Sequence, residues 1–360
     1  MASRTLILLG TEKGGFILEL DAARDPVALR GPFNEAMPVR HLAWDPARGN
    51  VLGGAGSPWY GPLVWRSEDL GETWTQSSEG LTYGDGPHDE AVTRVWNVTA
   101  IGDTLYAGVE PAGLFRSDDG GRSWSHVAGL REHPSRAGWE PGAGGLILHT
   151  IVGHPVDPRQ MWIGISAVGV FHTADGGGTW EARNRGVEAV GTPEEQPETG
   201  YCVHKFGLHP ERPDVLFQQN HRGMYRSDDG AATWVSINEG LPSTFGFGLA
   251  VHPRDPETIW SIPLNGDSVG RFMPDGRAAV WRSRDGGASW SAQTEGLPQQ
   301  GAYFGVLREA MATDTHDDVG VYFGTSSGQL FGSRDEGDSW RLLADFLPRI
   351  SSVEAVVLGD

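Results

Sequence analysis

The 360-residue sequence contains one cysteine, Cys202, so no disulfide can form within the chain. No apolar run approaches the ~20 residues that a membrane-spanning helix requires. The first ten residues hold one Arg and a short apolar segment, which does not match a signal peptide. We therefore expect a soluble, cytoplasmic protein that has no membrane partner.

Basic residues are also scarce, with 28 Lys and Arg against 47 Asp and Glu, for a net charge of −19. Such a surface repels a phosphate backbone, so we expect no nucleic-acid partner. Phosphate-loop and dinucleotide fingerprints are absent too, and no cofactor is assigned. The acidic excess otherwise concerns solubility and not the fold.

What the sequence does contain is an eight-residue motif, Ser-x-Asp-x-Gly-x-x-Trp, in six variants. The copies are SEDLGETW (67–74), SDDGGRSW (117–124), TADGGGTW (173–180), SDDGAATW (227–234), SRDGGASW (283–290) and SRDEGDSW (333–340). Their Trp residues are spaced by 50, 56, 54, 56 and 50 residues. A period of about 50 with strand-like flanks is typical of propeller blades that have four strands each.

The chemistry of this motif suits a turn. An Asp carboxylate can accept hydrogen bonds from the N–H groups of its own loop, Gly can adopt positive φ, and the Trp can bury a large face. Active sites rarely occur in six copies, so we assign a structural role to the six aspartates. They are Asp69, Asp119, Asp175, Asp229, Asp285 and Asp335.

On these motifs the chain resembles the Asp-box (BNR-repeat) propellers. That superfamily includes sialidases, xyloglucan-degrading glycosidases, the sortilin ectodomain and the photosystem II assembly factor. The resemblance covers nearly the whole chain. It implies that the boxes are structural and lie away from the ligand face.

We predict an all-β fold, a seven-bladed β-propeller with six Asp boxes that forms a single domain over residues 1–360. The segment TLILLGTEKGGFILEL near the N-terminus repeats the strand pattern without a box, and SSVEAVVL near the C-terminus supplies one more strand. An open ring would expose two sheet edges. We therefore expect residues near 353–358 to pair with residues near 5–9 and close the ring.

We align the first strands on a following His-Pro or Asp-Pro, and we place strands that lack it by the distance to the next strand, which gives one channel position. That position is occupied by Arg40, Arg94, His149, His204, Phe247 and Arg308. Three Arg and two His in an acidic protein favour an anion pocket, because Arg forks match carboxylate, phosphate or sulfate. The alternative is that each side chain is solvated or paired with a neighbour such as Glu309 or Glu354. The resemblance to sialidases, which bind a substrate carboxylate with three arginines, points the same way.

Long loops gather on this face and suggest a ligand rim. Glu110 and Glu140 are the carboxylates we propose for acid–base catalysis, although solvated rim glutamates are the commoner case. Trp59 and Tyr303 are proposed to contact the substrate, and Trp59 could stack on a sugar ring or simply anchor its loop. His149 and His204 could share a metal, but no ligand spacing supports this, so no metal residue is assigned.

Two functions remain open at this point. The first is a hydrolase or lyase that acts on a small anionic or carbohydrate-like substrate at the mouth of the central channel. The alternative is a non-catalytic ligand-binding or assembly scaffold, as the resemblance to the photosystem factor implies. A xyloglucanase is disfavoured because neither a signal peptide nor paired Asp residues are evident. Fold alone does not choose between the two functions.

Overall fold

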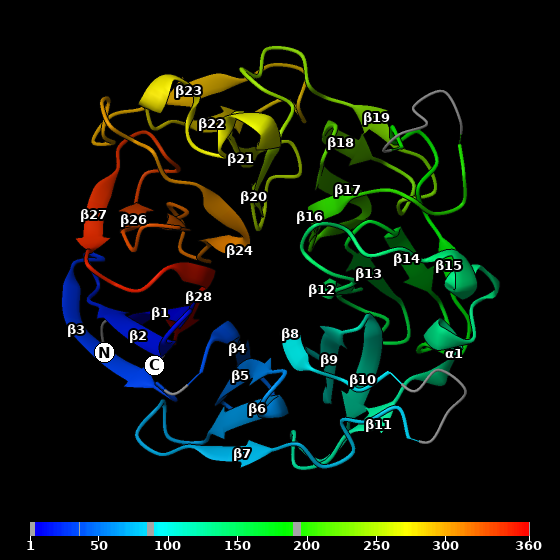
Figure 1. The fold of residues 1–360 in the computed structure, drawn as a ribbon. Coiled ribbons are helices and arrows are strands. Elements are labelled where there is room, and N and C mark those ends of the chain that lie inside the picture. The colour runs from blue at the N-terminus through cyan, green and yellow to red at the C-terminus, as the bar shows by residue number, and fades with distance from the viewer. Residues whose placement is uncertain (1–3, 36, 85–89, 190–195, 360) are drawn as a thin grey trace.

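The computed structural model describes residues 4–35, 37–84, 90–189 and 196–359, and its strands form six sheets arranged radially around a central channel (Figure 1). Five of these sheets have four strands each, in antiparallel order. The first contains β4 (Val39–Asp45), β5 (Asn50–Ser57), β6 (Gly61–Ser67) and β7 (Thr75–Ser77). The second contains β8 (Arg94–Ile101), β9 (Thr104–Glu110), β10 (Gly113–Ser117) and β11 (Ser125–His126).

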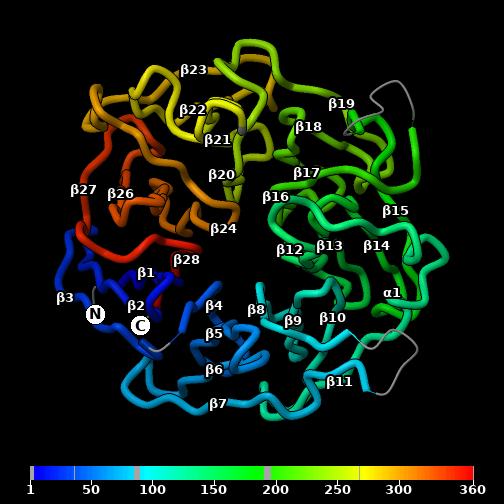
Figure 2. The backbone as a smooth tube through the Cα atoms, in the orientation of Figure 1, coloured from blue at the N-terminus to red at the C-terminus, as the bar shows by residue number. Residues whose placement is uncertain are grey.

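The next three sheets follow the same order along the chain. One contains β12 (Leu148–Gly153), β13 (Met161–Ile165), β14 (Gly169–Thr173) and β15 (Glu181–Ala182). Another contains β16 (Val203–His209), β17 (Arg212–Asn220), β18 (Gly223–Ser227) and β19 (Val235–Ser236). The last contains β20 (Gly246–Val251), β21 (Ile259–Pro263), β22 (Val280–Ser283) and β23 (Ser291–Gln293). In each sheet the chain runs from the channel outward, so β4, β8, β12, β16 and β20 lie innermost (Figure 2).

The sixth sheet has eight strands, in the order β27-β26-β25-β24-β28-β1-β2-β3. One half contains β24 (Val306–Thr313), β25 (Val321–Thr325), β26 (Leu330–Ser333) and β27 (Arg341–Ala344). The other half contains β28 (Ile350–Leu358), β1 (Arg4–Thr11), β2 (Gly14–Leu20) and β3 (Pro26–Phe33). The halves meet through one parallel pairing, between Glu309 and Ser352. The terminal strands pair as predicted, with Thr5 opposite Val357 and Leu9 opposite Val353.

Within the described residues, the helices are short and occur only in loops that connect strands. They are α1 (Ala128–Arg131) and the 3₁₀ turns η1 (Pro134–Gly138), η2 (Asp267–Val269) and η3 (Pro274–Gly276). None of the described helices has the length and apolar character needed to cross a membrane.

The six repeated turns share one hydrogen-bond pattern. In the first, Ser67 donates through Oγ to Asp69 (2.8 Å), and the Asp69 carboxylate also accepts from the backbone N–H (2.8 Å) and hydroxyl (2.6 Å) of Thr73. These hydrogen bonds, the Thr73 hydroxyl first, lower the pKa of Asp69 to about 2. The equivalent bonds recur at the other five aspartates. Each turn therefore satisfies its own carboxylate within eight residues.

The tryptophan that ends each motif ties one sheet to its neighbour. Trp124 is buried in a cluster with Leu105 and Phe115 of its own sheet and Leu52 of the preceding one. Its backbone N–H donates to the carbonyl of Glu79, in the loop after β7 (2.9 Å). At Gly80, where φ is +78°, an added Cβ would lie 1.8 Å from the Trp124 carbonyl oxygen. Only glycine fits this close approach between neighbouring repeats.

Candidate functional site

A register shift in the innermost strands aims side chains into the channel. Strand pairing skips one residue between Val39 and His41 in β4, and the same shift occurs in β8, β12, β16 and β20. The skipped residues are Arg40, Trp96, His149, His204 and Phe247. In β24 the interruption is longer, from Val306 to Met311, and contains Arg308. A bulged residue leaves the ladder and re-aims its side chain, so one backbone feature builds the whole ring.

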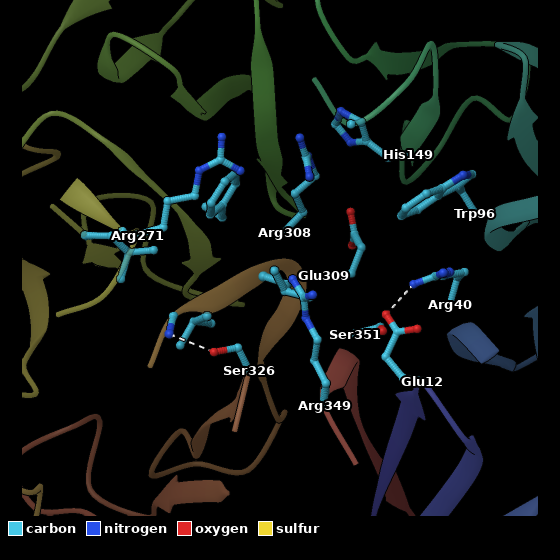
Figure 3. Close-up of a pocket in the computed structure, with 17 residues that line it drawn as sticks. Glu12, Arg40, Trp96, His149, Arg271, Arg308, Glu309, Ser326, Arg349 and Ser351 are labelled. Atoms are coloured by element: carbon cyan, nitrogen blue, oxygen red, sulfur yellow. Dashed lines mark hydrogen bonds and ion pairs between the residues drawn. The ribbon is translucent and has the colours of Figure 1, made fainter. Parts of the chain in front are cut away.

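Five of these side chains line one cavity of about 670 Å³ at the channel mouth. They are Arg40, Trp96, His149, Phe247 and Arg308, and the sequence had placed all of them except Trp96 at the channel position. Glu12 and Glu309 lie on the same wall (Figure 3). Arg271 and Arg349 also line the cavity. The sequence analysis missed both arginines because neither occupies the aligned strand position: Arg271 lies in the long loop between β21 and β22, and Arg349 immediately precedes β28.

The alignment was wrong in β8, where Trp96 and not Arg94 takes the channel position. Arg94 lies two residues earlier and lines neither of the two cavities described here. Its Nε lies 3.0 Å from Glu110 Oε2, which also accepts from Trp96 Nε1 (3.0 Å). Glu110, which we expected to be catalytic, thus binds an arginine and a tryptophan and also lies outside both cavity linings.

Arg40 is neutralised within the protein. Its Nη1 lies 2.6 Å from Glu12 Oε1, and its guanidinium lies over the Trp96 ring, 5.0 Å from the centroid. Figure 3 shows this ion pair at the edge of the cavity. The second carboxylate of the wall, Glu309, is also paired, because Lys205 Nζ binds its Oε2. Both cavity carboxylates therefore have a cationic partner.

Arg308 differs from Arg40. Among the described residues it makes no ion pair, whereas the Nε atoms of both arginines are buried without a hydrogen-bond partner. Its guanidinium lies 5.0 Å from the centroid of the Phe247 ring. Burial lowers the pKa of Arg308, against the attraction of Cys202 and Glu309. A guanidinium stays charged in proteins, so this part of the cavity keeps an excess positive charge.

The two channel histidines are held as neutral rings. His149 contacts Thr150 Oγ1 through Nδ1 (2.9 Å) and the Val203 carbonyl through Nε2 (3.2 Å). Burial, followed by the charge of Arg308, lowers the pKa of both His149 and His204 well below its ordinary value. Both nitrogens of His149 have partners within the protein, so a metal shared between His149 and His204 does not fit.

A second cavity of about 450 Å³ adjoins the first and shares Phe247, Arg271 and Arg308 with it. Its wall includes His204 and the predicted rim carboxylate Glu140, which is exposed. Cys202 and His221, which the sequence analysis did not assign, complete its polar lining. Arg308 therefore faces ligands that enter either cavity.

The two aromatic residues proposed to contact substrate lie apart from this wall. Trp59 is 93% exposed and Tyr303 is 71% exposed, and neither lines the two cavities. Tyr303 packs edge-on against Phe272, with ring centroids 5.1 Å apart. Their contact with a ligand stays a prediction.

The radial sheets and central channel define a β-propeller. Comparison with known proteins finds two kinds of relative, xyloglucanases and a photosystem II assembly lipoprotein. No family model matches the sequence. A xyloglucanase from Paenibacillus sp is 26% identical over 288 residues, which cover 72% of this chain and 25% of that protein. The photosystem II assembly lipoprotein Ycf48 of Synechococcus sp. (strain CC9902) is 25% identical over 356 residues, covering 93% of this chain and 84% of that protein. The chain spans about a quarter of the length of the xyloglucanases.

Solved structures agree on the fold. The GH74 enzyme of Niastella koreensis superposes with a TM-score of 0.62 at 18% identity, over 95% of this chain and 55% of that chain. YCF48 bound to D1 peptide superposes with a TM-score of 0.55 at 16% identity, over 89% of this chain and 92% of that chain. The GH74 enzyme and YCF48 thus both have the fold that this chain adopts.

Proposed function

We propose that this protein is a non-catalytic propeller that binds a small anionic ligand, bearing a carboxylate or a phosphate, at the mouth of its channel. The observation that carries the proposal is Arg308, a cation that lines both cavities and forms no ion pair among the described residues. An arginine fork matches a planar or tetrahedral anion, and a ligand anion would supply the missing charge. Arg271 and Arg349 lie on the same wall and add to the field.

We further infer that the fold is the seven-bladed form of the Asp-box propellers. The two halves of the eight-stranded sheet have four antiparallel strands each and meet through a single parallel pairing. Counting the halves separately gives two blades, which join the five four-stranded sheets. The shared hydrogen bonds of the six turns support the assignment of the boxes.

The comparison with Ycf48 supports a binding role. Its similarity extends over 84% of that protein, and one of the solved relatives is YCF48 in complex with a D1 peptide. A peptide segment with acidic side chains or a free carboxylate is therefore one class of anion to test here, beside small organic acids.

The test is calorimetric titration with citrate, inorganic phosphate, galacturonate and a short acidic peptide. At least one should bind, and Arg308→Gln should weaken it by about 10- to 100-fold, the loss expected for a charged hydrogen bond of ~1.5–3 kcal/mol. Arg94→Gln is the matched control, because Arg94 pairs with Glu110 outside both cavities. No binding by any probe, or equal binding by Arg308→Gln, would overturn the proposal.

A carbohydrate hydrolase is the second candidate, because two carboxylates face the channel region from β24 and β28. Burial raises the pKa of Glu354 to about 7, with a smaller contribution from Glu309, while the Trp44 N–H hydrogen bond lowers it. A carboxyl group that titrates near neutrality has the property of a general acid. Glu309 lines the cavity and Glu354 does not, which is why this function stands second.

Release of reducing ends from xyloglucan oligosaccharides tests the hydrolase directly. Turnover by the protein, abolished in Glu354→Gln and in Glu309→Gln, would establish catalysis and replace the binding role. The absence of turnover, together with anion binding that depends on Arg308, would exclude this second function.

A further inference from the structure

Three side chains with metal-binding atoms meet in the second cavity. Cys202 Sγ and one ring nitrogen each of His204 and His221 all lie within 4.8 Å of one another. His204 is buried, whereas Cys202 and His221 are half-buried, so the cluster borders the cavity without being sealed from it. A thiolate with two imidazoles is a donor set that suits zinc.

The backbone holds this cluster on paired strands. Cys202 directly precedes β16, and His221 follows β17, its antiparallel partner. The His221 N–H donates to the Cys202 carbonyl (2.9 Å), which fixes the two residues opposite each other. His204 is the bulged residue of β16, which turns its ring toward the same side of the cavity.

The ring of His204 is oriented as in metal sites. Its Nδ1 lies 2.6 Å from the Gly246 carbonyl oxygen, which accepts only if Nδ1 carries the proton. The unprotonated Nε2 then faces Cys202 Sγ at 3.5 Å. A backbone carbonyl that fixes the tautomer and ring of a histidine is the usual outer support of a metal ligand.

The spacing of these atoms matches tetrahedral coordination. Zinc bonds of about 2.3 Å to sulfur and about 2.0–2.1 Å to nitrogen place two ligands about 3.5–3.6 Å apart at a tetrahedral angle. The distance between Cys202 Sγ and His204 Nε2 is 3.5 Å. The rings of His204 and His221 meet edge to face, with centroids 5.5 Å apart, and a ring nitrogen of His221 lies within 4.8 Å of both other donor atoms.

We propose that Cys202, His204 and His221 bind a Zn²⁺ ion whose fourth coordination position opens into the second cavity. Three protein ligands with one open position are the arrangement of zinc sites that bind a water or a ligand. Arg308 lines the same cavity, so an anion could bind the ion and the guanidinium together. The metal site itself rests on the cluster geometry and does not depend on the proposed anion binding.

The experiment uses Co²⁺ alone as a probe, added to protein freed of metal with a chelator. One equivalent of Co²⁺ should produce the visible absorption of a tetrahedral ion together with a thiolate-to-cobalt charge-transfer band. Excess Zn²⁺ should abolish both by displacement. Failure of the wild-type protein to develop the thiolate band would overturn the proposal, and this result is independent of whether any anion binds.

Three variants locate the site. Cys202→Ser should lose the thiolate band. Both Cys202→Ser and His221→Asn should weaken Co²⁺ binding at least about 10- to 100-fold, which is the loss in metal affinity that removal of an outer-shell partner causes. His316→Asn is the control, because His316 contacts Thr5 Oγ1 (2.8 Å) and lines neither cavity. Thermal unfolding of each variant monitors the fold. A band that persists in Cys202→Ser, or equal Co²⁺ affinity in His221→Asn and wild type, would refute the site.

Discussion

The outer turns and the channel mouth use repetition in opposite ways. At the six turns the same residue types make the same hydrogen bonds, and each carboxylate finds its partners within its own loop. At the channel the backbone also repeats, but the side chains it presents differ in type, as Arg40, Trp96, His149 and Phe247 show. The repeated turns at the periphery stabilise the ring of sheets, whereas the varied side chains at the centre determine what the channel can bind.

The two regions also differ in where their partners come from. Asp69 is satisfied by Ser67 and Thr73, a few residues away. Glu309 is satisfied by Lys205 and Thr150, which lie 104 and 159 residues away along the chain. A substitution at a turn should therefore have a local structural cost, whereas one at the channel should change charge and binding.

The sharpest test of this contrast is a pair of tryptophans. Trp124→Ala should destabilise the protein by about 3–5 kcal/mol, because the buried ring leaves a large cavity between two sheets. Trp59→Ala should leave stability unchanged, since that ring is 93% exposed. Urea unfolding measures both. Equal stability of the two variants would contradict the role given to the repeated tryptophans.

A smaller effect is expected from a carboxyl group in the channel. The pKa of Glu354 is raised by burial to about 7, above its ordinary value of 4.5. Below pH 4.5 the group is protonated in both the folded and unfolded states; as the pH rises through 7, the folded state loses stability relative to the unfolded state. Glu354→Gln should thus gain about 3 kcal/mol over wild type at pH 8 and nothing near pH 4.

Unfolding midpoints of wild type and Glu354→Gln across that range give the measurement. The Gln side chain keeps an oxygen that can accept from the Trp44 N–H, so only the charge changes. A difference that does not vary with pH would show that Glu354 has an ordinary pKa in the folded protein.

The smallest effect should come from one turn carboxylate. Asp119→Ala removes acceptors for Ser123 N–H (3.0 Å) and the Ser123 hydroxyl (2.7 Å) in an exposed loop, which should cost about 1 kcal/mol. Anion binding should be unaffected, because Asp119 lies outside both cavities. Loss of anion binding in folded Asp119→Ala protein would contradict the assignment of a structural role to the turns and a binding role to the channel.

The sequence was sufficient for the parts of the molecule that depend on local chemistry. The turn residues, their spacing and the terminal strands predicted the radial sheets and the pairing of β1 with β28. The His-Pro and Asp-Pro landmarks also located Arg40, His149 and Phe247 at the cavity. In β8 the landmark is absent, and there the alignment chose Arg94 in place of Trp96.

What the sequence could not supply is the set of contacts made between sheets. Nothing near Arg40 in the chain identifies Glu12 as its partner, or Lys205 as the partner of Glu309. The same holds for Cys202 and His221, which are separated by β16 and β17 and meet only when those strands pair. Charge balance at the channel, and with it the importance of Arg308, follows from these long-range contacts.

The pairing of β1 with β28 has a consequence for the order of folding. Thr5 and its partner Val357 are separated by almost the whole sequence. The other sheets can form from contiguous segments during synthesis, but β1 has no inner neighbour until residue 358 is made. Such distant contacts form late because the loop between them must first be closed. The ring is therefore closed late in folding, and until then the inner edge of β1 is open to other chains.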